Sequence, residues 1–278
     1  PWLVGGRRGG SGRPAKVAAW SGIALLIGLA LGSVLGLAVW SLAAAWRFPD
    51  AWPAALSQGG WTHRLHLVAQ PALATLAIGL ATTLVALLLV AGCLENESRQ
   101  RRRPGRGALT MIYLPLLVPQ IGFLFGVQLL LVRCGLDGTY VGVVWAHLLF
   151  VLPYVFLTLA DPYRSLDPRY ARSAQALGKP PWVVWLRVKL AMLLRPILIA
   201  GAVGFAVSVA QYVPTLFAGG GRIMSLTTEA LSLAAGGNRR TVGVVAFTLA
   251  VLPLLGFALA IGVPAWRFRH RRALITAT

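Results

Sequence analysis

Polar side chains that could hydrogen-bond to a solute are concentrated in two otherwise apolar stretches of the sequence. Their hydroxyl, phenol and amide groups donate and accept hydrogen bonds without carrying charge, so the chemistry they offer is recognition of polar groups. They could line a path for a solute, or they could hold neighbouring helices together. The denser stretch contains Ser208, Gln211, Tyr212 and Thr215, and the other contains Gln120 and Gln128.

The sequence contains no pattern typical of catalysis or metal binding. Neither paired carboxylates nor a nucleophile next to a base can be recognised. The two cysteines and four histidines are scattered and form no CxxC or HExxH pattern. The glycine cluster GGRRGGSG lacks the lysine of a phosphate-binding loop. We therefore expect no catalytic residue, no metal ligand and no cofactor bound by this chain.

The composition is that of a membrane protein. Hydrophobic residues make up 57% of the 278 residues and charged residues only 12%, about half the charged share of a soluble domain. The net charge of +19 could indicate nucleic-acid binding, but no motif of that class accompanies it. Arginine-rich cytoplasmic loops explain the charge better.

Six apolar stretches are long enough to cross a bilayer, which takes about 20 residues. The sequence therefore predicts an all-α integral membrane protein with a six-helix transmembrane bundle over residues 17–266. The expected spans are Val17–Trp46, Val68–Leu94, Ala108–Val132, Thr139–Ala160, Pro196–Ala218 and Thr241–Trp266. In the third of these, Pro115 and Pro119 each remove a backbone donor, so we expect a weakened helix there.

The distribution of basic residues predicts the orientation. Most of the 26 Lys and Arg residues fall in a basic arm (residues 1–16), in the second and fourth loops, and in a basic tail (267–278). Such a bias marks the cytoplasmic side, so both termini are expected in the cytoplasm. This topology separates Cys93 from Cys134 by the hydrocarbon core, so they are not expected to form a disulfide.

Two features of the N-terminal region leave alternatives open. Ala43, Ala44 and Ala45 resemble a signal-peptide cleavage site, although the preceding apolar run is longer than a signal core. The first residue is proline, and the Gly/Arg-rich residues 5–14 resemble a linker. A second half, fused or separate, is therefore one expectation for this protein.

The expected spans contain no ionisable side chain except His147. Transporters driven by ion gradients usually carry such groups within their spans. A lone imidazole could relay protons, but a hydrogen-bonded structural role is the simpler interpretation. Uphill transport would therefore need another subunit to supply energy.

The longest cytoplasmic loop, residues 161–195, contains a compact helix signal. Asp167 can cap a helix that starts at Pro168, and Gly178 can end it in the left-handed conformation. Tyr170, Ala174 and Leu177 would share one face of this helix. A second helix, from about Pro181 to Leu194, would then return along the membrane surface. The unit could rest on lipid headgroups or dock into a groove of another protein.

The run LDPRYARSAQALGKPPWVVWLRVKLAMLLRPIL, residues 166–198, resembles the coupling loop of permease subunits of binding-protein-dependent ABC importers. That family's pattern is Glu-Ala-Ala, three residues, Gly, about nine residues and Ile-x-Leu-Pro. Ala174, Gly178 and Leu190 match it, and Val188 takes the place of the isoleucine. Three depart from it: Arg172 stands for the glutamate, Ser173 for the first alanine and Ala191 for the proline.

The resemblance implies a type I importer permease that works with two ATPase subunits, a second permease half and an extracytoplasmic solute-binding protein. It also implies a location in a bacterial inner membrane. ATP and Mg²⁺ would bind in the ATPase, and the loop helix would sit in a cleft of that subunit. The residues expected at this joint are Asp167, Tyr170, Arg172, Ala174, Leu177 and Gly178. The run AQYVPTLFAGGGRIMSLTTEAL further resembles the permease branch for thiamine, iron(III) and polyamines.

Two other classes remain possible from the residues alone. The chain could be a channel that needs no energy source, or a membrane scaffold without transport activity. In both cases the loop helix would simply lie on the lipid surface. Neighbouring reading frames that encode an ATPase and a secreted binding protein would favour the importer. The sequence does not identify the solute.

Overall fold

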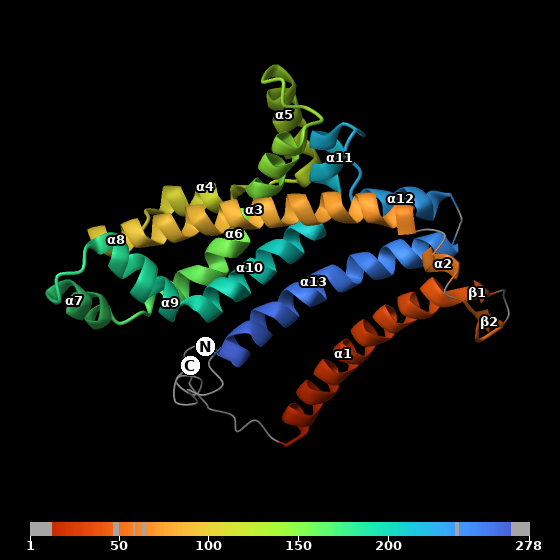
Figure 1. Ribbon diagram of the computed structural model, residues 1–278, viewed down its shortest axis with the longest axis horizontal. Coiled ribbons are helices and arrows are strands. Elements are labelled where there is room, and N and C mark those ends of the chain that lie inside the picture. Colours follow the sequence, from red (N-terminus) through yellow and green to blue (C-terminus); the bar gives the residue numbers. More distant parts are fainter. Residues whose placement is uncertain (1–12, 47–49, 58, 63–64, 237–238, 268–278) are drawn as a thin grey trace, which may run out of the picture.

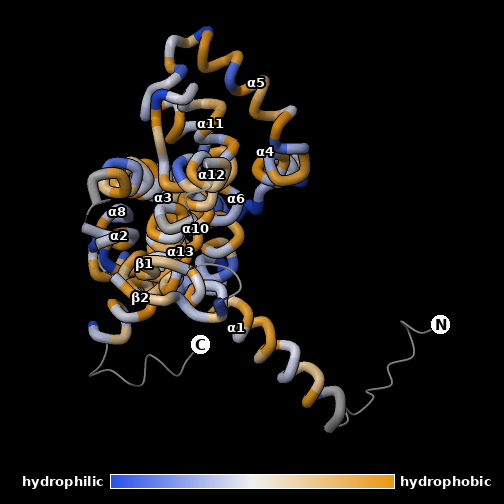
Figure 2. Tube along the Cα trace, turned by 90° about the vertical axis from the view of Figure 1, so that its right-hand side faces the viewer, coloured by the Kyte–Doolittle hydropathy of each residue, from blue (hydrophilic) through white to orange (hydrophobic). Residues whose placement is uncertain are grey.

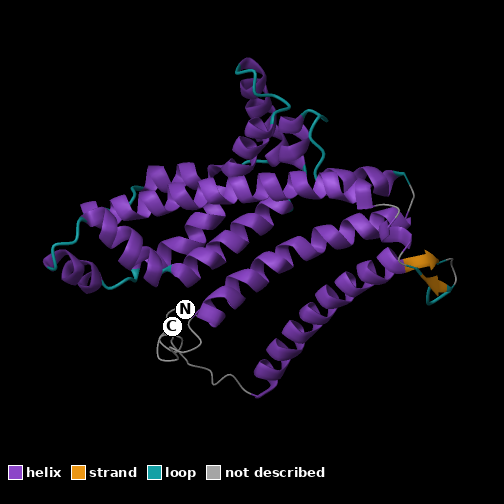
Figure 3. Cartoon of the chain, in the orientation of Figure 1, coloured by secondary structure: helices purple, strands orange, loops and turns teal. Residues whose placement is uncertain are grey.

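The computed structural model describes residues 13–46, 50–57, 59–62, 65–236 and 239–267. Helices account for nearly all of this part of the chain (Figure 3). A two-stranded antiparallel pair, β1 (Ala43–Ala45) and β2 (Ala55–Leu56), is the described exception. The expected all-α membrane-protein class is therefore confirmed. Most of the basic arm and of the basic tail lies outside the described residues.

Long helices alternate with short ones along the chain. The long helices are α1 (Arg13–Leu42), α3 (Leu65–Gln100), α6 (Tyr140–Arg164), α10 (Leu194–Val209) and α13 (Arg239–Arg267). The shorter ones are α2 (Gly59–Thr62), α4 (Arg106–Leu117), α5 (Gln120–Arg133), α7 (Pro168–Ala176), α8 (Pro181–Val184), α9 (Leu190–Met192), α11 (Val213–Gly219) and α12 (Leu226–Ala235). A π-helical turn, η1 (Trp185–Lys189), joins α8 to α9.

The core lies where α3, α6 and α10 pack together (Figure 1). Fully buried aliphatic side chains such as Val151, Val155 and Leu159 fill it. Gly204 of α10 lets the helices approach closely, because a β-carbon there would lie 2.8 Å from the Val155 side chain. Helix α13 packs against α10, and α1 packs against α13.

Helix α1 leaves the bundle towards its N-terminal end (Figure 2). Its residues from Lys16 to Ser33 are all exposed in this chain. Added β-carbons at Gly28, Gly32 and Gly36 would meet no atom within 4 Å. The expected first span ran to Trp46, but the helix ends at Leu42 because the next residues pair as a strand with β2.

The third expected span, Ala108–Val132, is broken into two helices. Helices α4 and α5 meet at an angle of 105°, and α5 projects from the bundle beside α11 (Figure 1). A residue before proline is disfavoured in helical geometry. Val118, which precedes Pro119, accordingly has an extended conformation with ψ of 140°. The expected weakening by proline is thus a full break between two helices, which can still count together as one bent span.

The fifth expected span, Pro196–Ala218, is also interrupted. Helix α10 ends at Val209, residues 210–212 are non-helical, and α11 starts at Val213. Pro214 falls within the first turn of α11, where its missing N–H costs nothing. On the preceding side, the segment Pro181–Met192 meets α10 at 75°.

Within the described ranges, four helices are long and apolar enough to cross a membrane, and the number rises to six if each bent pair counts as one span. Helices α3 and α6 run in the same direction, because an ion pair joins their C-terminal ends: Arg164 lies 2.8 Å from Glu97. The segment between them, α4 and α5, must therefore bring the chain back to the opposite end of the bundle.

Candidate functional site

Helix α7 has the two caps that its sequence predicts. The Asp167 carboxylate accepts a hydrogen bond from the Arg169 N–H at 2.8 Å. At the other end Gly178 has a φ of 74°. Its N–H donates to the carbonyl of Gln175, and the Lys179 N–H donates to the carbonyl of Ala174. This paired closure requires a left-handed residue, which glycine supplies at low cost.

The expected coupling residues form an exposed surface outside the bundle. No side chain of α7 is buried. Tyr170 is 54% exposed and Leu177 is 80% exposed, with Ala174 half-buried beside them. Arg172 is also exposed. Helix α6 continues to Arg164, so the first four residues of the expected loop 161–195 are helical and its non-helical part starts at Ser165.

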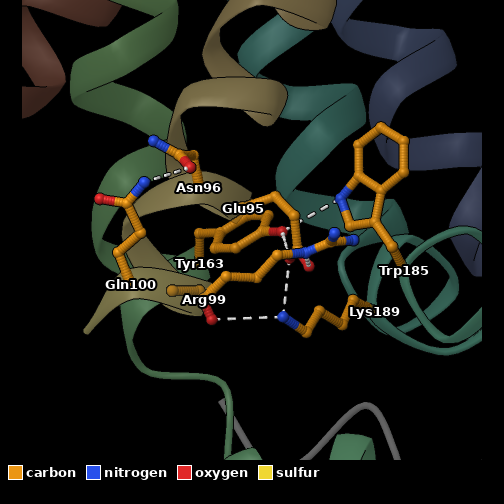
Figure 4. A network of polar contacts seen from close by, with 8 residues as sticks. Glu95, Asn96, Arg99, Gln100, Tyr163, Trp185 and Lys189 are labelled. Carbon is orange, nitrogen blue, oxygen red and sulfur yellow. Dashed lines mark hydrogen bonds and ion pairs between the residues drawn. The ribbon is translucent and has the colours of Figure 1, made fainter. Parts of the chain in front are cut away.

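A buried carboxylate lies behind this surface (Figure 4). Glu95, near the end of α3, is 7% exposed. It accepts hydrogen bonds from Lys189 of η1 at 2.7 Å, from the Tyr163 hydroxyl of α6 at 2.6 Å and from Arg99 of its own helix at 2.7 Å. The Trp185 indole N–H donates to the Tyr163 hydroxyl at 3.1 Å. We call these five residues the Glu95 network.

The Glu95 network was not predicted from the sequence. The second span was expected to end at Leu94, so Glu95 counted as the first loop residue, whereas α3 continues to Gln100. Its partners outside α3, Tyr163 and Lys189, are 68 and 94 residues away along the chain. The available signal was an acidic residue directly after an apolar run, because such a carboxylate needs donors when the helix continues.

A cavity of about 670 Å³ opens between the end of α3 and α7. Three acidic residues line it, and each already has a role: Glu95 and Glu97 form ion pairs, and Asp167 caps α7. Four lining arginines have no acidic partner within ion-pair distance among the described residues. These are Arg101, Arg102, Arg103 and Arg172. The cavity therefore has an excess of positive charge.

A second polar cluster is buried in the bundle around His147 of α6. Its Nδ1 lies 2.8 Å from the Ser208 hydroxyl, and its Nε2 lies 2.9 Å from the Thr215 hydroxyl. Thr215 also donates to the carbonyl of Gln211 at 2.8 Å. Both ring nitrogens and both hydroxyls are satisfied if Nε2–H donates to Thr215 and Ser208 donates to Nδ1. His147 is thus hydrogen-bonded on both sides, as its simpler interpretation required.

Only some of the polar residues expected to line a solute pathway lie close together in the structure. Ser208, Gln211 and Thr215 are buried within the His147 cluster, at the break between α10 and α11. Tyr212 is half-buried beside them in the chain. Gln120 and Gln128 lie on α5, exposed and half-buried respectively. Within the described part of the chain, no hydrogen bond joins either of them to the cluster.

Comparison with known proteins gives matches of one kind. Over 192 residues the chain is 39% identical to the inner membrane ABC transporter permease protein YnjC of Escherichia coli. The chain is similar to ABC transporter permeases. It is also 31% identical over 156 residues to the molybdenum transport system permease protein ModB of Mycobacterium bovis and of Mycobacterium tuberculosis. No family model matches it.

These matches cover parts of the relatives. The YnjC alignment spans 69% of this chain and 36% of YnjC, and the ModB alignment spans 51% of this chain and 58% of ModB. Together with the apolar helices, they support a multi-pass inner membrane protein of the permease kind. The relatives are transport proteins rather than enzymes. The thiamine, iron(III) and polyamine branch is not confirmed by them.

Proposed function

We propose that this chain is a permease subunit of an ATP-driven importer and forms part of its solute pathway. A separate ATPase, which binds ATP and Mg²⁺, would be coupled to it through residues 161–195. The observation that carries the proposal is α7: a doubly capped helix with an exposed Tyr170–Leu177 face, held outside the bundle. The sequence of the chain is similar to that of an ABC transporter permease. Both termini would lie in the cytoplasm.

The charge of the docking surface supports the choice of partner. Arg172 stands where the importer pattern has glutamate, and the cavity beside it contains three further arginines without an acidic partner among the described residues. A complementary acidic surface on the ATPase would stabilise docking and orient it. The positive charge of Arg172 is opposite to that of the glutamate in the importer pattern, so we propose an acidic partner surface at this position.

The solute would pass near the His147 cluster and the break between α10 and α11. Interrupted helices lined by polar groups at membrane depth are typical of solute sites in transporters. Gln211 Oε1, Thr82 Oγ1 and Thr83 Oγ1 are buried without a hydrogen-bond partner in the described structure. A second permease half, identical or different, would complete the pathway, with α1 available to contact it or lipid.

Copurification tests the docking proposal. We would express the chain with the ATPase and the binding protein from neighbouring reading frames, and compare Arg172→Glu with Arg187→Glu. Both arginines are exposed, but Arg187 lies in η1, outside α7. We expect Arg172→Glu to weaken ATPase binding about fivefold, the effect of losing a surface charge pair of about 1 kcal/mol, and Arg187→Glu to bind normally.

Two results would contradict the proposal. Failure of the unmodified chain to bind the ATPase would favour a channel or a scaffold. Equal binding by both variants would remove Arg172 from the interface. The solute is then identified from melting temperatures of the binding protein with molybdate, thiamine, iron(III) and spermidine. Molybdate is included because ModB is a molybdenum transport permease, and the others because of the sequence resemblance.

A further inference from the structure

Helix α7 has no direct anchor in the bundle core. It packs mainly against α8 and η1, and none of its side chains is buried. A force applied to α7 must therefore pass through α8 and η1 before it reaches a long helix. The contacts of η1 with the bundle decide whether that force is transmitted.

The turn η1 contacts the bundle through three hydrogen bonds donated by two of its side chains. Lys189 donates to Glu95 of α3 and also to Ser98 of α3, at 3.2 Å. Trp185 donates to Tyr163 of α6, whose hydroxyl in turn donates to Glu95. One segment is thus bonded to the cytoplasmic ends of two long helices through a single carboxylate (Figure 4).

The π-helical geometry of η1 serves these contacts. The Leu190 N–H donates to the carbonyl of Trp185, which closes the wider turn of a π-helix. Within that turn both Trp185 and Lys189 reach the same network. Single π-turns are rare and often lie at functional sites. The interruption falls at the two residues that contact α3 and α6.

We propose that the Glu95–Lys189 pair is a positioning joint that makes the coupling segment, residues 168–189, move as one body with the cytoplasmic ends of α3 and α6. Lys189 and Glu95 are nearly buried, with side chains 12% and 10% exposed. Loss of Lys189 would leave Glu95 with Arg99 of its own helix as its ion-pair partner, and would remove the ion pair between η1 and α3. Breaking a nearly buried pair is costly, so the contact favours one arrangement of η1 against α3. This role rests on the proposed permease function.

Two neighbouring ion pairs provide internal controls. Arg99 bonds to the same carboxylate but lies on the same helix, so it connects no elements. Arg164 bonds to Glu97 and ties α6 to α3, but it does not involve the coupling segment. A general bracing role would make all three pairs equivalent. A positioning joint makes Lys189 different from Arg99 and Arg164.

A distance measurement tests the joint in the full chain, assembled with its partners. Spin labels are placed at the native Cys93 of α3 and at Gln175→Cys of α7, both exposed, with Cys134→Ser to remove the other thiol. We expect one narrow distance distribution for the parent chain, Arg99→Gln and Arg164→Gln. Lys189→Met should broaden the distribution, and Lys189→Arg should restore it.

ATP hydrolysis gives the functional readout. Proteoliposomes contain the assembled complex and the binding protein loaded with the solute that raises its melting temperature. We expect Lys189→Met to lower the stimulation by binding protein about tenfold, the effect on an equilibrium of losing one charge-assisted hydrogen bond. Lys189→Arg should recover most of it, and Arg99→Gln should keep it.

The outcomes separate this inference from the proposed function. A parent complex without stimulation contradicts the importer, while the label distances still test the joint. A narrow distribution for Lys189→Met, or equal loss in all three variants, overturns the joint. If Lys189→Met does not assemble, Tyr163→Phe removes only the hydroxyl between Glu95 and Trp185. Tyr163→Phe should broaden the distribution, and an unchanged distribution would contradict the joint.

Discussion

His147 shows how a single residue gains its role from distant partners. Its imidazole connects α6 to Ser208 at the end of α10 and to Thr215 in α11. The backbone is non-helical between those two helices, so side-chain bonds replace part of the missing ladder. Gln211 adds a bond from its amide to the His147 carbonyl at 3.4 Å. Side-chain hydrogen bonds therefore stabilise the break between α10 and α11.

Replacement of His147 should destabilise the bundle. His147→Phe keeps a ring but leaves the Ser208 hydroxyl buried without its partner, at a cost of about 1–3 kcal/mol. Thermal unfolding in detergent should show a lower midpoint. The matched control is Thr158→Val on the same helix, which removes only a local bond to the Tyr154 carbonyl at an exposed position. Equal midpoints for the two variants would contradict a structural role of the imidazole.

Residues that lie close together because they are neighbours along the chain could be predicted from the sequence. Contacts between segments far apart in the sequence could not. Ser208, Gln211 and Thr215 were grouped correctly because they are neighbours along the chain. The bond from His147 to Ser208 spans 61 residues, and the bond from Lys189 to Glu95 spans 94. Such pairs depend on how the helices pack against one another. The periodicity of a single segment carries no information about that packing. The functional assignments of these residues stay predictions.

At the scale of elements, local signals were most informative where the chain leaves the bundle. The caps of α7 placed its start correctly and its end within one residue, because Asp167, Pro168 and Gly178 act on their nearest neighbours. In the third span, the apolar composition predicted one crossing. It did not predict that Val118, which precedes Pro119, is extended and separates two helices. Hydropathy shows only how many consecutive residues are apolar, so it does not reveal a bend between two helices within one apolar run.

The left-handed end of α7 can be tested at Gly178. A β-carbon there would meet nothing within 4 Å, so any cost of substitution comes from the backbone, whose φ is 74°. Gly178→Val should cost about 1–2 kcal/mol and unwind the last turn of α7. We expect lower solute-stimulated ATP hydrolysis, with the chain still in the membrane.

Asparagine provides the control at this position, because it tolerates the left-handed conformation. Gly178→Asn should therefore retain more stimulation than Gly178→Val. Normal coupling in the valine variant would argue against docking through α7. Equal loss in both variants would mean that side-chain bulk, rather than the backbone conformation, disturbs the docked helix.

For the whole molecule, the polar contacts at the helix ends constrain the path of the chain. The Glu97–Arg164 pair puts the C-terminal ends of α3 and α6 together. The Leu226 N–H, at the start of α12, donates to Thr75 in the first third of α3 at 2.8 Å. Helix α10 therefore starts near one end of α3, beside Lys189, and leads to the other. These directions agree with the larger number of candidate spans, which is six if each bent pair counts as one span.

The two cysteines can decide whether α4 and α5 form a bent crossing or a loop that returns to the same side. Both thiols are free and exposed, Cys93 near the end of α3 and Cys134 just after α5. Since α3 and α6 run in the same direction, we expect the thiols on opposite sides of the membrane. A membrane-impermeant maleimide should label Cys134 in intact spheroplasts and Cys93 only after permeabilisation. Single-cysteine variants, Cys93→Ser and Cys134→Ser, identify each signal. Labelling of both thiols from one side would mean that α4 and α5 re-enter, and it would place α7 on the side away from any cytoplasmic ATPase.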